Sequence, residues 1–315
     1  MSIASLLVDS AFVGSIPRFA APIVLAGLGG ALCRRVGVFN VALEAMMLAG
    51  AFAAVAASYA AGSALSGVAM AALAGALVGA LFAIAAVWKR GDAIVVGIAL
   101  NILISAATSF ALRAVFGVRG SFDDPRIAAL PRLDAPLLAD VPGVGPLFAG
   151  QTALVWLAAL AVAVVHVFLS RHPLGIRWRG VGEHPVAARS LGVSVGRTQA
   201  AALVVCGLLC GLAGAQLAIG TVSLFVENMT AGRGWIAVVV VLLGAARPVL
   251  VAALAVLFGV VDAVGFRLQG LGLPQQFTEM LPYVVTLTAL AASGWRRRGG
   301  RSRWRTRRSP ESSER

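Results

Sequence analysis

The sequence predicts an all-α polytopic membrane protein with about nine transmembrane helices, within a range of eight to ten. Of its 315 residues, 59% are hydrophobic and only 12% are charged, and the mean hydropathy is +0.91. Soluble domains carry about 25% charged residues, so too little polar surface remains here to cover a water-soluble fold. The apolar residues form long runs of Ala, Leu, Val and Gly, which favours helices over the alternating strands of an outer-membrane barrel.

Nine apolar segments form the predicted spans, and residues 1–295 are predicted to be one transmembrane domain. A full crossing needs about 20 residues, so we expect the short apolar piece at residues 2–14 to lie in the membrane interface. Residues 296–315 are expected to form a disordered basic tail. The nine segments run near 16–33, 38–61, 66–87, 93–116, 151–170, 199–219, 235–246, 248–266 and 280–295.

The distribution of basic residues predicts the orientation of the chain. When the sides alternate from a cytoplasmic Arg34, 19 of the 26 Lys and Arg residues fall on the cytoplasmic side. The basic tail then lies in the cytoplasm against the membrane, where it contacts lipid and not nucleic acid, despite the net charge of +13. We therefore expect a multi-pass protein of a bacterial inner membrane with a cytoplasmic C-terminus. The loop at 117–150 is then extracytoplasmic and proline-rich, and the loop at 171–198 is cytoplasmic.

Small residues occur at helical spacing within the apolar segments. Gly75-x-x-x-Gly79 and Gly207-x-x-x-Gly211 are two examples. Such pairs let membrane helices approach each other closely. Glycine is also common in membrane helices without any such role, so both interpretations remain open for each pair.

Two parts of the chain are similar in sequence. Gly27–Ala31 is similar to Gly211–Ala215, and Asn40 and Asn228 each stand where a polar stretch leads into an apolar one. The matched spans run in opposite directions, which is the pattern of an inverted repeat with a solute route between its halves. Alanine-rich helices also match by chance, so a true inverted repeat and a chance similarity both remain open.

Few polar side chains lie inside the predicted spans, where such groups usually face the protein interior or a wet cavity. Asn40 and Glu44 are four residues apart, so on a helix they share one face. We interpret Glu44 as a hydrogen-bond partner of a neighbouring helix end, with direct solute contact as the alternative. Asn101, near the middle of its span, either lines a pathway or joins two helices.

A second polar cluster, Phe225–Trp235, follows one span and opens the next on the outer side. Gly232 and Gly234 permit tight backbone turns there. Structural and functional roles are both open for the polar side chains at this expected pathway mouth, which are Glu227, Asn228, Thr230 and Arg233.

A third cluster lies in the cytoplasmic loop. Pro185 and Gly192 bracket a short helix, because proline favours the first helical turn and glycine the position after a helix end. A short helix in a long cytoplasmic loop suits docking onto another protein. The residues of this expected docking loop are Gly182, Glu183, His184, Pro185, Ala187, Ala188, Arg189 and Gly192.

The sequence shows no motif for catalysis or for a bound ion. It has no Gly-x-x-x-x-Gly-Lys-Ser/Thr phosphate loop, and Lys89 is its single lysine. No carboxylate pair or histidine cluster has catalytic or metal-binding spacing, and Cys33, Cys206 and Cys210 are interpreted as small core residues. We predict no enzyme activity, no metal and no cofactor, and any ATP hydrolysis must take place on another chain.

The three clusters also resemble the motifs of permeases in the branched-chain amino acid and ribose-type ABC importer superfamily. Gly37–Gly50 resembles "GVxNIGLEGMMLxGA", and Asp92–Asn101 resembles "DQIVSGIAINL". Gly182–Ala188 resembles "GENPxAA", Phe225–Gly234 resembles "FxENMTAGRGF", and Leu281–Tyr283 resembles "MLPYxxTL". The matches cover most of the chain, and the form of the fourth motif is more similar to the nucleoside and simple-sugar branch than to the amino-acid branch.

The sequence departs from these motifs at three positions. Ala45 replaces a glycine, His184 an asparagine and Val96 a common serine. No charge or proline is lost, so the fold that the resemblance implies is unaffected, but the substrate is less well defined.

The resemblance implies the membrane subunit of an ATP-driven importer of nucleosides or simple sugars. Its implied partners are a second permease subunit, a cytoplasmic ATP-binding subunit and an extracytoplasmic substrate-binding protein. The docking loop would then couple to the ATPase. Alternatives are a branched-chain amino acid permease of the same superfamily, an ion-coupled secondary transporter using Glu44 and Asp262, and a non-transporting membrane scaffold.

Overall fold

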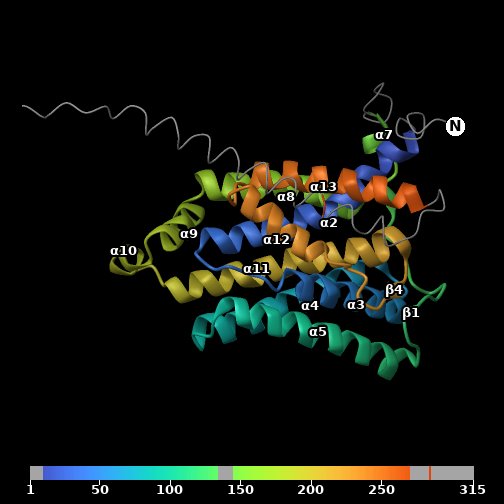
Figure 1. Cartoon of the computed structure of the whole chain (residues 1–315), viewed down its shortest axis with the longest axis horizontal. Helices are drawn as coiled ribbons and strands as arrows, with labels where there is room; N and C mark the ends of the chain where they lie inside the picture. The colour runs from blue at the N-terminus through green and yellow to red at the C-terminus, as the bar shows by residue number, and fades with distance from the viewer. Residues whose placement is uncertain (1–9, 134–144, 270–283, 285–315) are drawn as a thin grey trace, which may run out of the picture. The chain divides into compact units, whose positions relative to one another are not determined.

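The computed structural model of the chain describes residues 10–133, 145–269 and 284 (Figure 1). The chain divides into two compact units, Met1–Val264 and Gly265–Arg315. The first unit contains nearly all of the described residues and every feature considered below.

Helices make up most of the described structure. The long helices are α2 (Ser10–Arg35), α3 (Leu43–Ala61), α4 (Ala64–Phe82), α5 (Ala93–Phe116), α8 (Ala153–Arg171), α11 (Val195–Ala215) and α13 (Pro248–Gln269). The π-helical segments η1 (Ala83–Trp88) and η2 (Gln216–Val222) extend α4 and α11. The shorter helices are α7 (Gly145–Phe148), α9 (Pro173–Glu183), α10 (Pro185–Ser190) and α12 (Arg233–Leu243).

Seven of the described helices are long and apolar enough to cross a membrane, and α12 is a shorter apolar helix. The predicted all-α polytopic membrane protein is therefore confirmed. Eight of the nine predicted segments coincide with these helices, whereas the segment at 280–295 lies outside the described residues except for Val284. The basic tail and the apolar piece before Ser10 also lie outside them.

One predicted span begins later than expected. The segment near 38–61 was predicted to be helical from its start, but α3 begins only at Leu43. Gly37 adopts a φ of 82°, and the side chain of Asn40 accepts a hydrogen bond from the backbone N–H of Ala42 at 2.8 Å. This local bond offers the backbone an alternative to helix, so the prediction was wrong for this turn.

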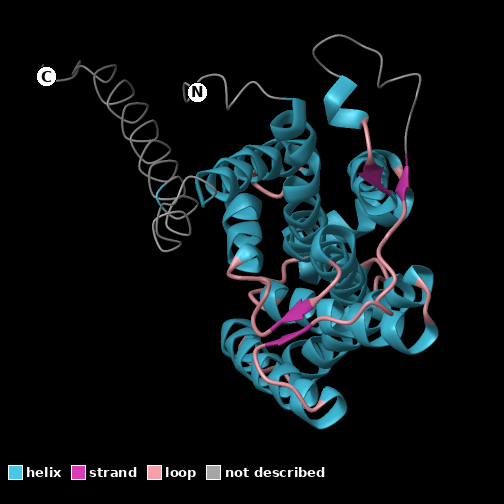
Figure 2. Ribbon diagram, turned by 90° about the vertical axis from the view of Figure 1, so that its right-hand side faces the viewer, coloured by secondary structure: helices cyan, strands magenta, loops and turns pink. Residues whose placement is uncertain are grey.

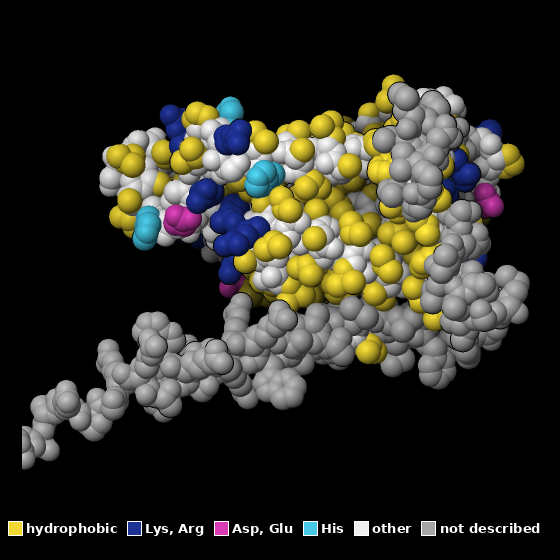
Figure 3. All heavy atoms as spheres, turned by 90° about the horizontal axis from the view of Figure 1, so that it is seen from above, with side chains coloured by type: hydrophobic (Ala, Val, Ile, Leu, Met, Phe, Trp, Pro, Cys, Tyr) yellow, Lys and Arg dark blue, Asp and Glu magenta, His cyan; other side chains and the backbone are white. Residues whose placement is uncertain are grey.

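The helices differ in how deeply they are buried. In the best 18-residue window of each span, 83% of the residues are buried in α11 with η2, against 17% in α5. Apolar side chains such as Ile102, Leu103 and Phe110 of α5 are exposed. Hydrophobic side chains also fill the middle of the face drawn in Figure 3, and charged side chains gather at its ends. This pattern suits a bundle whose outer helices face lipid.

Glycines let α11 pack directly against the backbone of α4. A Cβ atom on Gly207 would lie 2.2 Å from the carbonyl oxygen of Gly75, and one on Gly75 would lie 2.1 Å from that of Gly207. A Cβ atom on Gly79 would similarly lie 2.3 Å from the carbonyl oxygen of Leu203. Of the two interpretations left open for the Gly-x-x-x-Gly pairs, the structure shows the close approach of two helices, and the two pairs meet each other.

The bundle has two ends, which we call the α10 end and the β4 end (Figure 1). At the β4 end, β1 (Ser121–Phe122) pairs with β4 (Phe225–Val226), and β2 (Arg132–Leu133) pairs with β3 (Gln151–Thr152). Both pairs are antiparallel, and Figure 2 shows them in magenta. The described part of the long loop is thus built from turns, short strands and the one-turn helix α7, which suits its proline-rich sequence.

Aromatic packing fixes this loop on the helices. Phe122 stacks on Phe116 with ring centroids 4.0 Å apart, and Tyr59 meets both rings edge-on. The Arg126 guanidinium lies 4.2 Å from the centre of the Tyr59 ring and donates to Asp124. The side-chain hydrogen bond from Arg126 holds the pKa of the Asp124 carboxyl below its usual value.

Candidate functional site

The first turn of α12 is held by a carboxylate from α3. Glu44 accepts hydrogen bonds from the backbone N–H groups of Gly232 at 2.9 Å and Gly234 at 2.6 Å. The first N–H groups of a helix have no partner within the helix, and the positive end of the helix dipole favours a negative charge. Glu44 is only 8% exposed, so it supplies this cap from inside the bundle.

Glycine is required at this junction for two reasons. Gly232 adopts a φ of 81°, in the region that only glycine enters without cost. A Cβ atom on Gly234 would lie 2.4 Å from the backbone nitrogen of Glu44. The two glycines of the predicted pathway mouth therefore allow α3 and α12 to meet.

This junction lies well inside the bundle. The Phe225 ring packs edge-on against Phe52 at 5.3 Å, near the β4 end. Glu44 precedes Phe52 by two turns of α3, so the start of α12 lies about 12 Å deeper than Phe225 at 1.5 Å per residue. With 11 residues, α12 covers only part of a membrane. Non-helical backbone at such depth occurs where it is enclosed by protein or lines a wet cavity.

Asn101 joins α5 to the start of α3. Its Oδ1 accepts from the backbone N–H of Ala45 at 2.9 Å, and its Nδ2 donates to the carbonyl of Val41 at 3.1 Å. Of the two interpretations left open by the sequence, the structure therefore shows the helix-joining one.

Asn40 lies beside the cysteines. Its Nδ2 is 3.4 Å from the sulfur of Cys206 and 3.9 Å from that of Cys33. Cys33, Cys206 and Cys210 are all free and buried, as expected for small core residues. No group of three or more His, Cys, Asp or Glu in the described part of the chain is placed to hold a metal ion.

An ion pair lies just beyond the cap. The Nε of Arg233 is 3.1 Å from Oδ2 of Asp262 in α13, and the exposed fractions of the two side chains are 22% and 7%. The Nη1 of Arg233 also lies 3.5 Å from the carbonyl oxygen of Thr230. Thr230 is fully buried, and its hydroxyl has no hydrogen-bond partner among the residues that the structure describes. The sequence marked Asp262 as an acid within an apolar segment but did not connect it with Arg233.

The remaining residues of the second cluster lie at the β4 end. Glu227 and Gly120 exchange two hydrogen bonds, because the Glu227 side chain accepts from the N–H of Gly120 at 3.1 Å and its own N–H donates to the Gly120 carbonyl at 2.8 Å. Asn228 is exposed with a φ of 57°. These two residues therefore belong to a turn at the rim, apart from the cap at Glu44.

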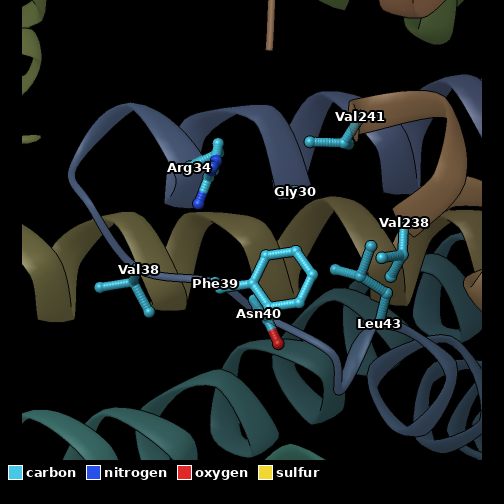
Figure 4. A pocket seen from close by; sticks show the side chains of 8 residues that line it. All are labelled: Gly30, Arg34, Val38, Phe39, Asn40, Leu43, Val238 and Val241. Atoms are coloured by element: carbon cyan, nitrogen blue, oxygen red, sulfur yellow. The ribbon is translucent and has the colours of Figure 1, made fainter. Parts of the chain in front are cut away.

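A small pocket opens between α2, the segment before α3, and α12 (Figure 4). Its empty volume is about 210 Å³, part of which is open solvent. Phe39 projects into it, and the guanidinium of Arg34 lies 5.8 Å from the centre of that ring. The other lining residues are Gly30, Val38, Asn40, Leu43, Val238 and Val241.

The predicted docking loop folds as two consecutive helices at the α10 end. Proline occupies the first turn of α10, and Gly192 follows the helix with a φ of 78°, as the sequence predicts. A Cβ atom on Gly182 would lie 2.2 Å from the carbonyl oxygen of Arg35, so the base of the loop sits directly on the end of α2.

Most side chains of α10 and of the residues on either side of it are exposed. Val186 is 75% exposed and Leu191, directly after the helix, is 83% exposed, whereas Ala188 is buried. Glu183, His184, Pro185, Ala187 and Arg189 are also exposed. The loop thus presents a short helix with apolar side chains on a base anchored by glycine.

Comparison with known proteins identifies the family. Residues 13–290 match the protein family described as "Branched-chain amino acid transport system / permease component". The chain belongs to this permease family. No solved structure matches it.

Several ABC transporter permeases are similar to this permease over most of their length. A guanosine ABC transporter permease protein of Bacillus subtilis is 33% identical over 86% of this chain and 88% of its own. A nucleoside ABC transporter permease protein of Lactococcus lactis subsp. cremoris is 32% identical over 89% of this chain and 90% of its own. A glucose ABC transporter permease protein of Haloferax volcanii is 28% identical over 88% and 76% respectively.

Proposed function

We propose that this permease is the membrane-spanning subunit of an ATP-driven importer that takes up nucleosides or related simple sugars. The names of its relatives, guanosine, nucleoside and glucose permeases, support this class of solute. The solute passes through without chemical change, and a separate subunit hydrolyses ATP.

The observation that carries the proposal is the geometry of α10. A helix of six residues that exposes Val186 and neighbouring side chains is poorly stabilised by its own chain. Because Gly182 packs directly on the end of α2, a displacement of this loop by a partner would be transmitted to the bundle. We assign the surface of Glu183–Gly192 to docking of the ATP-binding subunit, which the known relatives' description as ABC transporters supports.

The orientation follows from the same assignment. The α10 end is the cytoplasmic end, where Arg34, Arg35, Arg177, Arg189 and Arg247 give the basic excess expected of cytoplasmic loops. The β4 end then faces the extracytoplasmic substrate-binding protein, and the C-terminus is cytoplasmic. The membrane is the bacterial inner membrane, and a second permease subunit completes the pathway.

Within the pathway, the predicted residues take two kinds of role. Asn40, Glu44 and Asn101 support the ends of α3 and α12 through the hydrogen bonds described above. Thr230 and Arg233 contact the passing solute, and Glu227 and Asn228 shape the outer rim. A proton-coupled mechanism is disfavoured, because Glu44 is bound to two backbone N–H groups and Asp262 to Arg233.

The test is uptake of labelled guanosine, ribose and leucine in cells that lack the gene and in cells in which it is restored. We expect guanosine or ribose uptake to be lost and recovered, to stop when ATP is depleted, and to survive an uncoupler. A defect with leucine alone would move the protein to the amino-acid branch. Uptake that the uncoupler abolishes while ATP is maintained would refute ATP-driven import.

A further inference from the structure

Four charged or partly charged groups meet at the start of α12. They are the N-terminus of the helix, the Glu44 carboxylate, the Arg233 guanidinium and the Asp262 carboxylate. A helix N-terminus carries about half a positive charge, and adding an arginine there is normally unfavourable. Without the two acids, this junction would combine a positive helix end with a cation and would attract anions.

Glu44 and Asp262 neutralise the positive helix end and the arginine cation, respectively. Glu44 occupies the N–H groups of Gly232 and Gly234, and the N–H of Arg233 is bound to the Thr230 carbonyl. Asp262 binds the Arg233 side chain at 3.1 Å from a position that is 7% exposed. An arginine in the membrane interior is costly unless it is paired, so this contact decides where the guanidinium lies.

The pairing leaves hydrogen-bonding capacity at the junction. Arginine has five N–H donors, of which Asp262 engages the one on Nε and the Thr230 carbonyl, at 3.5 Å, one on Nη1. The Arg233 side chain remains 22% exposed, and beside it lies the buried Thr230, whose hydroxyl has no hydrogen-bond partner within the described part of the chain. Hydrogen-bond donors and acceptors whose net charge is cancelled by ion pairing suit a solute that carries hydroxyl groups and no charge.

On these grounds we propose that Asp262 is a positioning residue for transport. It fixes the Arg233 guanidinium beside Thr230 and cancels its charge, so that the junction serves uncharged, hydroxyl-bearing solutes. This inference rests on the proposed importer function, and Asp262 lies outside the sequence motifs that carry the family resemblance.

The test uses the complete importer, purified with its ATP-binding subunit and reconstituted with its binding protein in liposomes. Asp262→Asn should lower guanosine or ribose uptake at least about tenfold, the scale of a lost charge-assisted hydrogen bond, while the amount of assembled complex stays the same. Asp262→Glu, which restores the charge, should recover at least about threefold over Asp262→Asn.

The double variant Arg233→Gln/Asp262→Asn distinguishes a role of Asp262 in positioning the guanidinium from a role in stabilising the contact between α12 and α13. It removes both charges, so it should assemble as the wild type does, yet its uptake should stay low because the guanidinium donors are missing. Wild-type uptake in Asp262→Asn, or full recovery in the double variant, would overturn the proposal.

A second measurement does not depend on transport. The guanidinium lies beside the Thr230–Ala231 peptide, and Ala231 is exposed, whereas the three native cysteines are buried. In an Ala231→Cys background, Asp262→Asn should raise the rate of maleimide labelling at least about threefold, because a nearby unpaired cation increases the thiolate fraction. Equal labelling rates would refute the positioning role of Asp262, whatever the transport result. Failure of the wild-type importer to carry any of these solutes would refute the proposed function alone.

Discussion

Glu44 Oε2 lies 2.6 Å from the backbone nitrogen of Gly234, a residue 190 positions further along the chain. A single side chain in the first turn of α3 thereby holds the first turn of α12. This bond places a carboxylate, a helix end and a non-helical segment together inside the bundle.

Replacing Glu44 by glutamine should destabilise the protein by about 1.5–3 kcal/mol, because the charge-assisted bonds to Gly232 and Gly234 are lost. Thermal unfolding of the detergent-solubilised protein measures the effect. The matched control is Glu227→Gln, whose bond to Gly120 is partly exposed, and it should cost less than about 1 kcal/mol. Equal losses in the two variants would contradict the special role of Glu44.

Alanine at Gly207 should destabilise the bundle by at least about 1–3 kcal/mol, since its Cβ would overlap the carbonyl of Gly75 and force α11 away from α4. Gly196→Ala in the same helix is the control, because its Cβ would meet only Val87, at 3.7 Å. The unfolding temperature in detergent should fall for Gly207→Ala and stay near the wild type for Gly196→Ala. The reverse order would show that the two helices do not pack as described.

Leucine at Asn101 should cost about 1–3 kcal/mol, because it leaves the N–H of Ala45 and the carbonyl of Val41 without their partners. The neighbouring Ile102 is 67% exposed on the outer side of α5, so Ile102→Leu should have almost no effect. Thermal unfolding again compares the two variants. If Asn101→Leu were as stable as the wild type, the hydrogen bonds between α5 and α3 would contribute nothing to stability.

Tryptophan at Ala187, or arginine at Glu183, should lower solute-stimulated ATP hydrolysis several-fold in the reconstituted importer. Both residues are exposed on the docking loop, so protein levels in the membrane should not change. Leu65→Trp, at an exposed position of α4 near the β4 end, is the control and should hydrolyse ATP at the wild-type rate. Normal hydrolysis in both loop variants would rule out this surface as the ATPase contact.

The sequence was informative wherever a local pattern sets the structure. Hydropathy located α5 within one residue, because a membrane span is a continuous apolar run with polar ends. Proline and glycine located α10 because each restricts or permits specific backbone angles. The prediction from hydropathy was wrong at Val38–Ala42, where the Asn40 side chain replaces a helical hydrogen bond. Hydropathy does not register that competition.

The sequence predicted the residues of the candidate site but not most of the contacts between them. The polar residues within spans could be named, because each is costly in a membrane and therefore rare. Glu44 was expected to bond to a neighbouring helix end, but the sequence could not show that this end is the start of α12. The sequence also did not connect Asp262 with Arg233, although their side chains are 3.1 Å from each other.

By itself the sequence determined that this is a helical membrane protein, where most of its spans lie, and which short helix extends beyond them. These properties depend on transfer of apolar runs from water and on local backbone preferences, both of which act over a few consecutive residues. Only the tertiary structure decided that Glu44 caps α12, that Asp262 pairs with Arg233, and that Gly75 meets Gly207. Such contacts join residues far apart in the chain, and they exist only once the helices have packed at particular depths and rotations.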